Sequence, residues 1–319
     1  MHPDGVTVEG SARTAVRFRY RVEYLIFRIA FALFAALPLA AALRLGAWLG
    51  ALLCICDVPD RRVALVNLAI AFPEKSPAEH RRILRASCRN LGRVAVEFCH
   101  LPRLDARTIN DVLTFADRGA WHRALARADE RGAVIVTAHF GNWELLAYAH
   151  GLLGHPITLV HRPMHNPLFD DAITAIRAGA GTRAVKKKAA AKEALRALKR
   201  HSILVIPTDQ NQTFSAGVFV DFFGKLACTS PGAARLAMLT GAPVLPVFLV
   251  REGESAHHRV EVLPEIEMVN SGDRVADIVT NTQRCSTVIE AIIRRYPEQW
   301  IWFHKRWKTR PVGEPRLYT

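Results

Sequence analysis

Residues 131–155 read RGAVIVTAHFGNWELLAYAHGLLGH, and this stretch decides the fold. The run VIVT at 134–137 is apolar, β-branched and too short for a helix, which predicts a buried strand of a parallel sheet. A break at Gly141 precedes a helical pattern that starts at Trp143, with Asn142 as its N-cap. The order of strand, turn and helix indicates one unit of an α/β fold.

His139 stands where the predicted strand ends, and Glu144 follows in the first turn of the predicted helix. Ligands of open α/β sheets bind at the carboxyl ends of strands, where a helix N-terminus adds positive potential. The break between strand and helix allows the carboxylate to fold back onto the imidazole, so we predict a general base and its orienting partner. The alternative is a buried histidine bonded to backbone and an ordinary first-turn glutamate.

Strands and helices continue to alternate after this unit. We predict strands at 156–160, 202–207, 243–250 and 259–263, and helices at 121–130, 166–178, 230–242 and 275–296. Arg162 follows the first of these strands, and arginine suits bidentate binding of phosphate, although a surface ion pair is its other interpretation. Asp209 and Gln210 follow the strand at 202–207 and add polar groups at a strand end.

An aromatic segment at 217–224 contains Phe222 and Phe223. It suits either the wall of an apolar substrate tunnel or ordinary core packing. Near the C-terminus, residues 297–308 alternate aromatic and basic side chains, as expected at a membrane interface or over a substrate mouth. The lysines at 186–188 are either a solvated helix face or an anion-binding patch.

The composition is that of a basic globular protein. Its 319 residues are 50% hydrophobic, and 43 Lys plus Arg against 29 Asp plus Glu give a net charge of +14. This charge favours an anionic partner: a phospholipid surface, a phosphorylated substrate, an acidic protein or nucleic acid. The six cysteines lack metal-ligand spacing, so we expect no metal site and reduced thiols in or facing a cytoplasm.

The stretch 22–56 is almost wholly apolar. Arg28 and Arg44 bracket only fifteen uncharged residues, with Pro38 among them, short of the roughly twenty needed to cross a bilayer. A helix pair or kinked helix in one leaflet fits best, and a cleaved signal peptide or a soluble core helix are the alternatives. We predict a basic, membrane-associated segment at 1–56 and a catalytic domain at 57–319.

Several motifs together resemble the late acyltransferases of lipid A biosynthesis, the lauroyl and myristoyl transferases, within the lysophospholipid acyltransferase superfamily marked by His-x4-Asp/Glu. They are HFGNWE (139–144), HRP (161–163), DQN (209–211), GVFVDFFGKLACTSPGAARLA (217–237), TGAPVLPVF (240–248) and PEQWIWFHKRWKTRP (297–311). The resemblance runs in order from about Arg21 to Pro311. It implies a glycerol-3-phosphate acyltransferase-like fold, with a mostly parallel central sheet flanked by helices and an apolar N-terminal helical segment.

Carried over by position, the resemblance implies that His139 is the general base and Glu144 its orienting partner. Arg162 matches the anion-binding arginine of the second motif, and Asp209 lies where the third motif follows its strand. The sequence Thr208-Asp209-Gln210 replaces the Glu-Gly pair of glycerolipid enzymes, which disfavours a glycerol-phosphate acceptor. The predicted substrate-binding residues are Arg162, Asp209, Gln210, Asn142, Phe222 and Phe223.

The expected reaction transfers a fatty acyl chain from a thioester of acyl carrier protein or coenzyme A to a hydroxyl of a membrane glycolipid. It needs no covalent intermediate, metal or redox cofactor, and backbone amides near the Gly141 turn would stabilise the oxyanion. The expected location is the cytoplasmic face of a bacterial inner membrane, monotopic or single-pass.

Three alternatives remain at this point. They are a mannoside-type or other membrane lipid acyltransferase, a thioesterase-like hydrolase, and a non-catalytic membrane- or nucleic-acid-binding protein. The aromatic segment at 217–224 and the apolar N-terminus favour lipid over nucleic acid.

Overall fold

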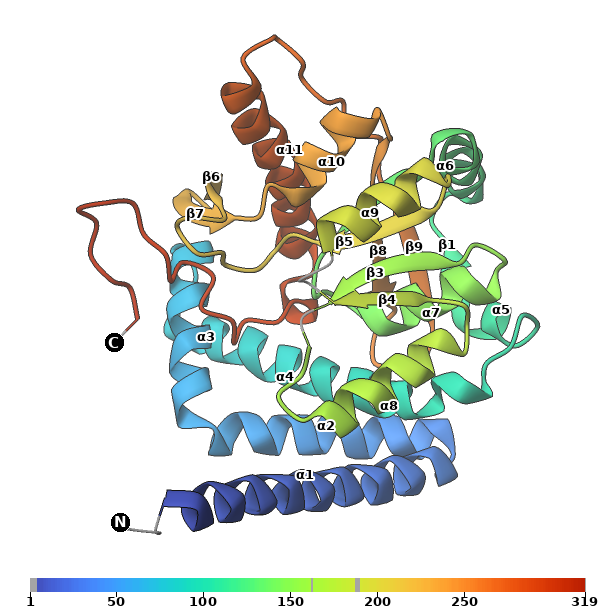
Figure 1. Cartoon of the computed structure of the whole chain (residues 1–319), viewed down its shortest axis with the longest axis vertical. Helices are drawn as coiled ribbons and strands as arrows, with labels where there is room; N and C mark the ends of the chain where they lie inside the picture. The colour runs from blue at the N-terminus through green and yellow to red at the C-terminus, as the bar shows by residue number, and fades with distance from the viewer. Residues whose placement is uncertain (1–4, 162, 187–189, 319) are drawn as a thin grey trace.

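The computed structural model describes residues 5–161, 163–186 and 190–318, and it has an α/β architecture (Figure 1). The strands of its central sheet are β1 (Leu113–Phe115), β2 (Ala133–Thr137), β3 (Ile157–His161), β4 (Arg183–Lys186), β5 (Ile203–Pro207), β8 (Val244–Arg251) and β9 (His258–Val262). Their order across the seven-stranded sheet is β1-β9-β8-β2-β5-β3-β4. Every neighbouring pair is parallel except β8 and β9. The predicted mostly parallel sheet is therefore confirmed.

Helices cover both faces of this sheet. One face carries α6 (Arg118–Arg131) and α7 (Trp143–Leu152), and the other carries α9 (Ala190–Lys199), α10 (Gly232–Thr240) and α11 (Arg274–Arg295). The helix α8 (Pro167–Ala178) packs beside β4, and the short helix α5 (Ile109–Val112) precedes β1. Alternate side chains of β2 explain this arrangement, because Ile135 belongs to the core on the α7 side while Val134 and Val136 belong to the other core.

Local sequence sets where these helices begin. The side chain of Asn142 accepts a hydrogen bond from the amide of Leu145 and caps α7, as predicted. Asn166 caps α8 in the same way, one residue before a proline at the first helical position. The predicted strands and helices from residue 121 onward all occur within a few residues of the expected bounds, whereas the short strands β1 and β4 were not predicted.

The N-terminal part is helical and lies below the sheet layer in Figure 1. It comprises α1 (Gly5–Ala36), α2 (Leu39–Cys56), α3 (Val58–Ala71) and α4 (Pro77–His100), and the 3-10 turn η1 (Leu101–Arg103) follows. The predicted helix pair is confirmed, with the break at Pro38. The helix α1 begins earlier than the apolar stretch suggested, because the preceding polar residues continue it. The predicted domain boundary falls at the turn between α2 and α3.

The helix α2 packs tightly against α4 through glycines. A Cβ atom at Gly92 would lie 2.0 Å from the carbonyl oxygen of Gly46, so the two backbones touch where any side chain would separate them. Among the described residues, α2 is the one helix long and apolar enough to cross a membrane, and 22% of it is buried. One side of α2 is therefore fixed to the domain while the remainder is exposed.

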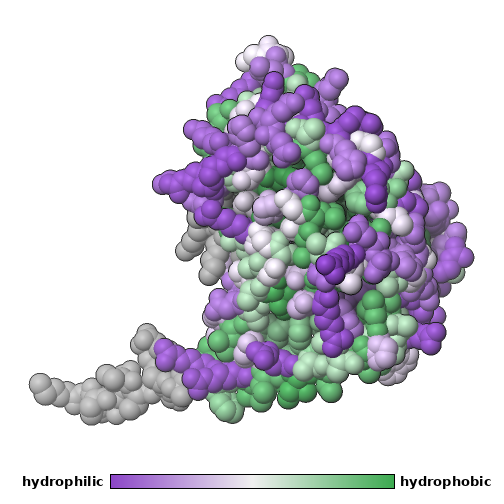
Figure 2. Space-filling view, turned by 90° about the vertical axis from the view of Figure 1, so that its right-hand side faces the viewer, coloured by the Kyte–Doolittle hydropathy of each residue, from purple (hydrophilic) through white to green (hydrophobic). Residues whose placement is uncertain are grey.

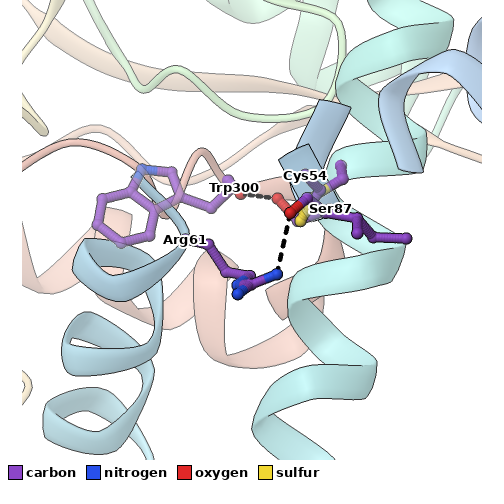
Figure 3. The surroundings of a disulfide bond; sticks show 6 residues. Cys54, Arg61, Ser87 and Trp300 are labelled. Atoms are coloured by element: carbon purple, nitrogen blue, oxygen red, sulfur yellow. Dashed lines mark hydrogen bonds between the residues drawn. A yellow bond between two sulfur atoms is a disulfide. The ribbon is translucent and has the colours of Figure 1, made fainter. Parts of the chain in front are cut away.

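A disulfide between Cys54 and Cys88 also joins α2 to α4, with 6.1 Å between the two Cα atoms (Figure 3). The expectation that all six cysteines are reduced is therefore wrong for these two. Beside the bridge, the hydroxyl of Ser87 donates a hydrogen bond to the carbonyl oxygen of Trp300 at 2.6 Å, and Arg61 of α3 donates to the carbonyl oxygen of Ile55 at 3.0 Å. The bond from Ser87 connects α4 to the C-terminal segment, whereas the bond from Arg61 connects α3 to α2.

Candidate active site

Two neighbouring parallel strands bring the central pair of the site together. In the ladder between β2 and β5, Thr137 lies opposite Pro207, so the residue two positions after each strand emerges at the same edge of the sheet. Those residues are His139 and Asp209. The Nδ1 atom of His139 lies 3.0 Å from Oδ1 of Asp209, and the backbone amide of His139 donates to Oδ2 at 2.9 Å.

Asp209 is 2% exposed. Its carboxylate accepts hydrogen bonds from His139 and Trp300. The indole Nε1–H of Trp300 gives it a third hydrogen bond at 2.8 Å. Burial alone would raise the pKa of Asp209, but the charge of His139 and the hydrogen bonds from His139 and Trp300 lower it to about 2. The network thus keeps Asp209 ionised, which assigns the proton of His139 to Nδ1 and leaves the lone pair on Nε2.

His139 is part-buried, with 25% of its side chain exposed. Burial lowers its pKa, but the charge and hydrogen bond of Asp209, followed by the charge of Glu144, outweigh burial and raise the pKa above its ordinary value. The ring also meets Trp143 edge-on, with 5.6 Å between the ring centroids. An imidazole held in one tautomer beside an ionised carboxylate is suited to proton transfer.

The turn after His139 is shaped by glycine and by the C-terminal segment. Gly141 has φ 57°, and a Cβ there would lie 1.7 Å from the carbonyl oxygen of Leu249. Its amide donates to the carbonyl oxygen of Gln299, in the 3-10 turn η3 (Pro297–Gln299), at 2.8 Å. Of the backbone amides near this turn that were predicted to stabilise an oxyanion, the amide of Gly141 is therefore already occupied. The amide of Ile301 holds the carbonyl oxygen of His139 at 3.3 Å.

Glu144 faces a different partner from the one expected. Its carboxylate accepts two hydrogen bonds from Arg177 of α8, at 2.9 Å from Nε and 2.5 Å from Nη2. Glu144 lies in the first turn of α7 and Arg177 in the last turn of α8, where the helix dipoles favour these charges. The hydrogen bond expected between His139 and Glu144 is thus donated by His139 to Asp209 instead, and Glu144 acts on His139 through its charge.

A cavity of about 450 Å³ opens beside His139 and runs between α7 and the sheet. Its mouth is polar and includes His139, Glu144, Arg177 and Gln210. Its interior is lined mainly by aliphatic side chains from β2, β3, β5 and α7, namely Ile135, Leu146, Ala147, Leu159 and Val205. A proton-accepting histidine at the mouth of an apolar cavity suits a substrate with a reactive polar end and a hydrocarbon body.

The sequence of this chain matches a known family over nearly its whole length. The family described as bacterial lipid A biosynthesis acyltransferase matches residues 12–309. The chain belongs to this family. It is 29% identical over 290 residues to the lipid A biosynthesis palmitoleoyltransferase of Escherichia coli K12, covering 90% of this chain and 91% of that protein.

Two further relatives of this acyltransferase come from the same organism. The lipid A biosynthesis lauroyltransferase is 29% identical over 289 residues, covering 88% of this chain and 90% of that protein. The lipid A biosynthesis myristoyltransferase is 24% identical over 284 residues, covering 86% and 82%. An acyltransferase activity and the predicted family are therefore shown.

The predicted substrate-binding residues of the acyltransferase do not all lie at the cavity. Gln210 lies at the cavity, with its Nε2 atom 3.4 Å from both ring nitrogens of His139. Asn142 is 0% exposed, caps α7 and is not among the residues that line the cavity. Phe222 and Phe223 are 1% and 5% exposed and pack in the aromatic core, which makes the core interpretation correct for them. Arg162 and the lysines 187 and 188 lie outside the described residues.

Phe222 belongs to β6 (Val218–Phe222), which pairs with β7 (Lys225–Thr229) in a separate two-stranded sheet. The tryptophans at 300, 302 and 307 pack beneath it and are at most 1% exposed. The expectation that residues 297–308 form a membrane interface or cover a substrate mouth is therefore wrong for these tryptophans. The segment instead buttresses the site, through the bond from Trp300 to Asp209.

A second buried cluster of the acyltransferase was missed from sequence. Glu97 of α4 accepts bonds of 2.6 Å from both terminal nitrogens of Arg251, and Nε2 of His258 lies 3.2 Å away. The amide group of Asn142 donates to Glu97 at 2.6 Å, so this cluster supports the cap of α7. The sequence motifs include neither this cluster nor Arg177. The residues of the cluster come from elements far apart in the chain, so no local pattern marks them.

Proposed function

We propose that this enzyme transfers a fatty acyl group from a thioester of acyl carrier protein or coenzyme A to a hydroxyl group of a lipid A precursor. The observation that carries the proposal is the pair of His139 and Asp209 at the mouth of an apolar cavity. The family membership and the positive charge of the chain support an anionic glycolipid as the acceptor.

In the proposed reaction, Nε2 of His139 removes the proton of the acceptor hydroxyl as its oxygen attacks the thioester carbonyl carbon. A tetrahedral intermediate forms, and its collapse breaks the bond between the carbonyl carbon and sulfur. The imidazolium returns the proton to the departing thiolate, so the products are an ester and a free thiol. A hydroxyl is a weak nucleophile at neutral pH, and such base catalysis typically contributes 10²- to 10⁴-fold.

Asp209 takes the orienting role in this proposal. Its carboxylate holds Nδ1 of His139 and stabilises the imidazolium, without accepting the proton itself. Glu144 adds a second negative charge near the ring, and Arg177 fixes that carboxylate at the cavity mouth. Gln210 is placed to contact the reacting groups, because it borders both His139 and the cavity.

The proposed membrane surface is the exposed side of α1 and α2. Figure 2 shows hydrophobic residues gathered along the base of the molecule, where these helices lie in Figure 1. The exposed large apolar side chains of these helices are Val16, Phe18, Val22, Leu25, Ile26, Ile29, Leu33, Leu45, Trp48, Leu52, Leu53 and Ile55. A contiguous apolar surface of this kind is typical of proteins that bind a bilayer.

A monotopic attachment fits α2 better than a transmembrane span. Its glycine face is packed against α4, and Arg44 interrupts its apolar sequence, so crossing the bilayer would require detaching the helix from the domain. Acyl carrier protein and coenzyme A thioesters are soluble donors, which supports the cytoplasmic face of a bacterial inner membrane. The substrate hydroxyl would then reach His139 from the lipid surface.

The test is transfer of a radiolabelled acyl chain to a tetra-acylated lipid A precursor in detergent, with carrier-protein and coenzyme A thioesters supplied separately. Wild type is expected to form the acylated lipid, His139→Ala to lose nearly all of this activity, and Asp209→Asn to keep only a small residual rate, with both variants folded. Glu144→Gln is expected to retain a larger residual rate than Asp209→Asn, because Glu144 acts on His139 only through its charge.

The outcomes separate the alternative functions. Consumption of thioester by wild type without a lipid product would favour a hydrolase. An acylated product with a different membrane lipid, and none with the lipid A precursor, would change the acceptor. Full activity of His139→Ala would rule out the site itself.

A further inference from the structure

One helix face defines the inner wall of the cavity. Trp143, Leu146, Ala147 and His150 all line it, and their spacing of three or four residues places them on one stripe of α7. Trp143 stands beside His139 at the mouth. His150 is seven residues further along, which at 1.5 Å per residue is about 10 Å deeper along the helix axis. The stripe therefore runs from the catalytic end inward and finishes at His150.

The facing wall includes the sheet, and Ile173 and Arg177 of α8 also line the cavity. Ile135, Leu159 and Val205 project from β2, β3 and β5 into the same cavity, and each belongs to or packs against the core on the α7 side. A hydrocarbon chain entering from His139 would thus be enclosed by aliphatic groups. Each methylene that is buried adds to the binding of the chain, so such a cavity favours the longest chain that fits.

His150 is the polar side chain at the inner end of the α7 stripe. Its side chain is 2% exposed, and neither ring nitrogen has a hydrogen-bond partner within the described residues. Burial lowers the pKa of His150 to about 3, so the ring is neutral. Behind it lies the indole ring of Trp121 from α6, with 4.8 Å between the centroids. Trp121 does not line the cavity, so the imidazole stands between the cavity and Trp121.

We propose that the imidazole of His150, backed by Trp121, is the end wall of the acyl-chain site and sets the longest acyl chain that this enzyme accepts. This inference rests on the proposed acyl-transfer function. The terminal methyl group of the chain would meet the ring face, and a longer chain would have to displace a side chain that the core holds in place. An added methylene that does not fit such a pocket is typically discriminated by about 10- to 200-fold.

The experiment measures relative kcat/KM by competition among saturated acyl carrier protein thioesters of ten to sixteen carbons, using the purified full chain in detergent with a tetra-acylated lipid A precursor. His150→Ala is expected to move the optimum to a longer chain. The ratio of kcat/KM for a chain two carbons above the wild-type optimum to that for the optimum itself should rise about 10-fold or more. If His150→Ala does not fold, His150→Val takes its place. It is expected to shift the optimal chain length in the same direction by a smaller amount.

Two further variants separate size from polarity and from general damage. His150→Leu fills similar space without ring nitrogens and is expected to keep the wild-type chain preference, because volume-conserving core changes are tolerated best. Leu145→Ala also removes a buried side chain from α7, but Leu145 does not line the cavity, so its preference should not move.

A folded His150→Ala variant with the wild-type chain preference would overturn the inference while leaving acyl transfer intact. A large change in His150→Leu would overturn it as well, because the nitrogens and not the bulk would then select the chain. Failure of wild type to transfer any chain would instead count against the proposed function.

Discussion

Two buried histidine–carboxylate clusters flank the turn that follows β2, and they use similar residues for different ends. Asp209 and Glu97 are both buried and both have a pKa lowered to about 2. Asp209 accepts hydrogen bonds from His139 and Trp300, and the ring of His139 reaches the cavity and has a raised pKa. Glu97 is instead neutralised by Arg251, and its histidine, His258, is fully buried with a lowered pKa.

The comparison shows why a histidine beside a carboxylate is not by itself an active site. Arginine cannot release its proton in this setting, so the Glu97 cluster is fixed in one charge state. Its role is structural, because Glu97 accepts a hydrogen bond from Asn142, which caps the first turn of α7. The Asp209 cluster has an exchangeable proton on a ring that faces a cavity. Access and exchangeable charge distinguish the two.

The largest expected effect on the rate comes from replacing the histidine of the Asp209 cluster with alanine, compared with the same change in the Glu97 cluster. His139→Ala should lower kcat/KM by about 10²- to 10⁴-fold, because the general base is lost. His258→Ala should lower stability and leave the activity of the folded fraction close to wild type. Rates with the lipid A precursor and urea unfolding measure the two effects. His122→Ala, an exposed change on α6, is the control, and equal rate losses in His139→Ala and His258→Ala would contradict the distinction.

Breaking the second cluster should mainly cost stability. Arg251→Met leaves Glu97 buried without its counter-ion, and such a loss typically destabilises a protein by about 3–5 kcal/mol. Urea unfolding followed by circular dichroism gives the value. The double variant Glu97→Leu with Arg251→Met removes both charges and should recover part of the loss. A double variant less stable than Arg251→Met would show that the ion pair is not the cause.

The pH dependence of the rate should report the first cluster. Only neutral His139 accepts a proton, so kcat/KM should rise as pH increases through the raised pKa of His139 and level off above it. Asp209→Asn removes the largest cause that raises the pKa of His139, so the inflection of its residual activity should move to lower pH. An inflection that stays in place would mean that Asp209 does not set the proton affinity of His139.

Trp300→Phe should have a moderate effect through Asp209. It removes one hydrogen bond to an ionised group, worth about 1.5–3 kcal/mol, and lets the carboxylate shift away from His139. We expect kcat/KM to fall about 10-fold, the change that 1.4 kcal/mol produces. Trp302→Phe is a matched control, since Trp302 is equally buried but donates to the carbonyl oxygen of Pro297. A rate loss as large in Trp302→Phe would point to core damage instead.

The smallest effect concerns a third buried histidine that has no carboxylate. His150 has two unpartnered ring nitrogens among the described residues, and each buried unsatisfied group is a cost. His150→Leu should therefore raise the free energy of unfolding by about 1 kcal/mol. Thermal unfolding of the purified protein checks the sign. A fall in stability would mean that the ring nitrogens are satisfied in solution.

Local sequence predicted the elements of this fold well. The β-branched run ending at Thr137, the glycine break and the cap at Asn142 each act over a few residues, so the strand, turn and helix follow from neighbours in the chain. The position of His139 at a strand end was predicted for the same reason. The short strands β1 and β4 were missed because three or four residues carry too little pattern.

The motif also predicted that Glu144 lies close to the site, but it did not predict which residue Glu144 contacts. From sequence, the carboxylate five residues after His139 is the natural partner, while Asp209 is seventy residues away. The choice depends on which strand pairs with β2, and on Arg177 arriving from α8 to take up Glu144. Neither is encoded in the local pattern. The same limit explains why the sequence predicts substrate binding for Phe222 and a membrane interface or substrate mouth for Trp300, although the core buries both.

By itself, the sequence determined the family, the alternation of strands and helices, the apolar N-terminal helix pair and a histidine at a strand end. The tertiary structure decided that β5 lies beside β2 in a register that aligns Thr137 with Pro207, and so made Asp209 the partner of His139. It also decided that a largely apolar cavity lies between α7 and the sheet, with His139 and His150 in its lining. Elements form from local backbone preferences, whereas a site forms from strand order and packing, which bring distant residues to one edge.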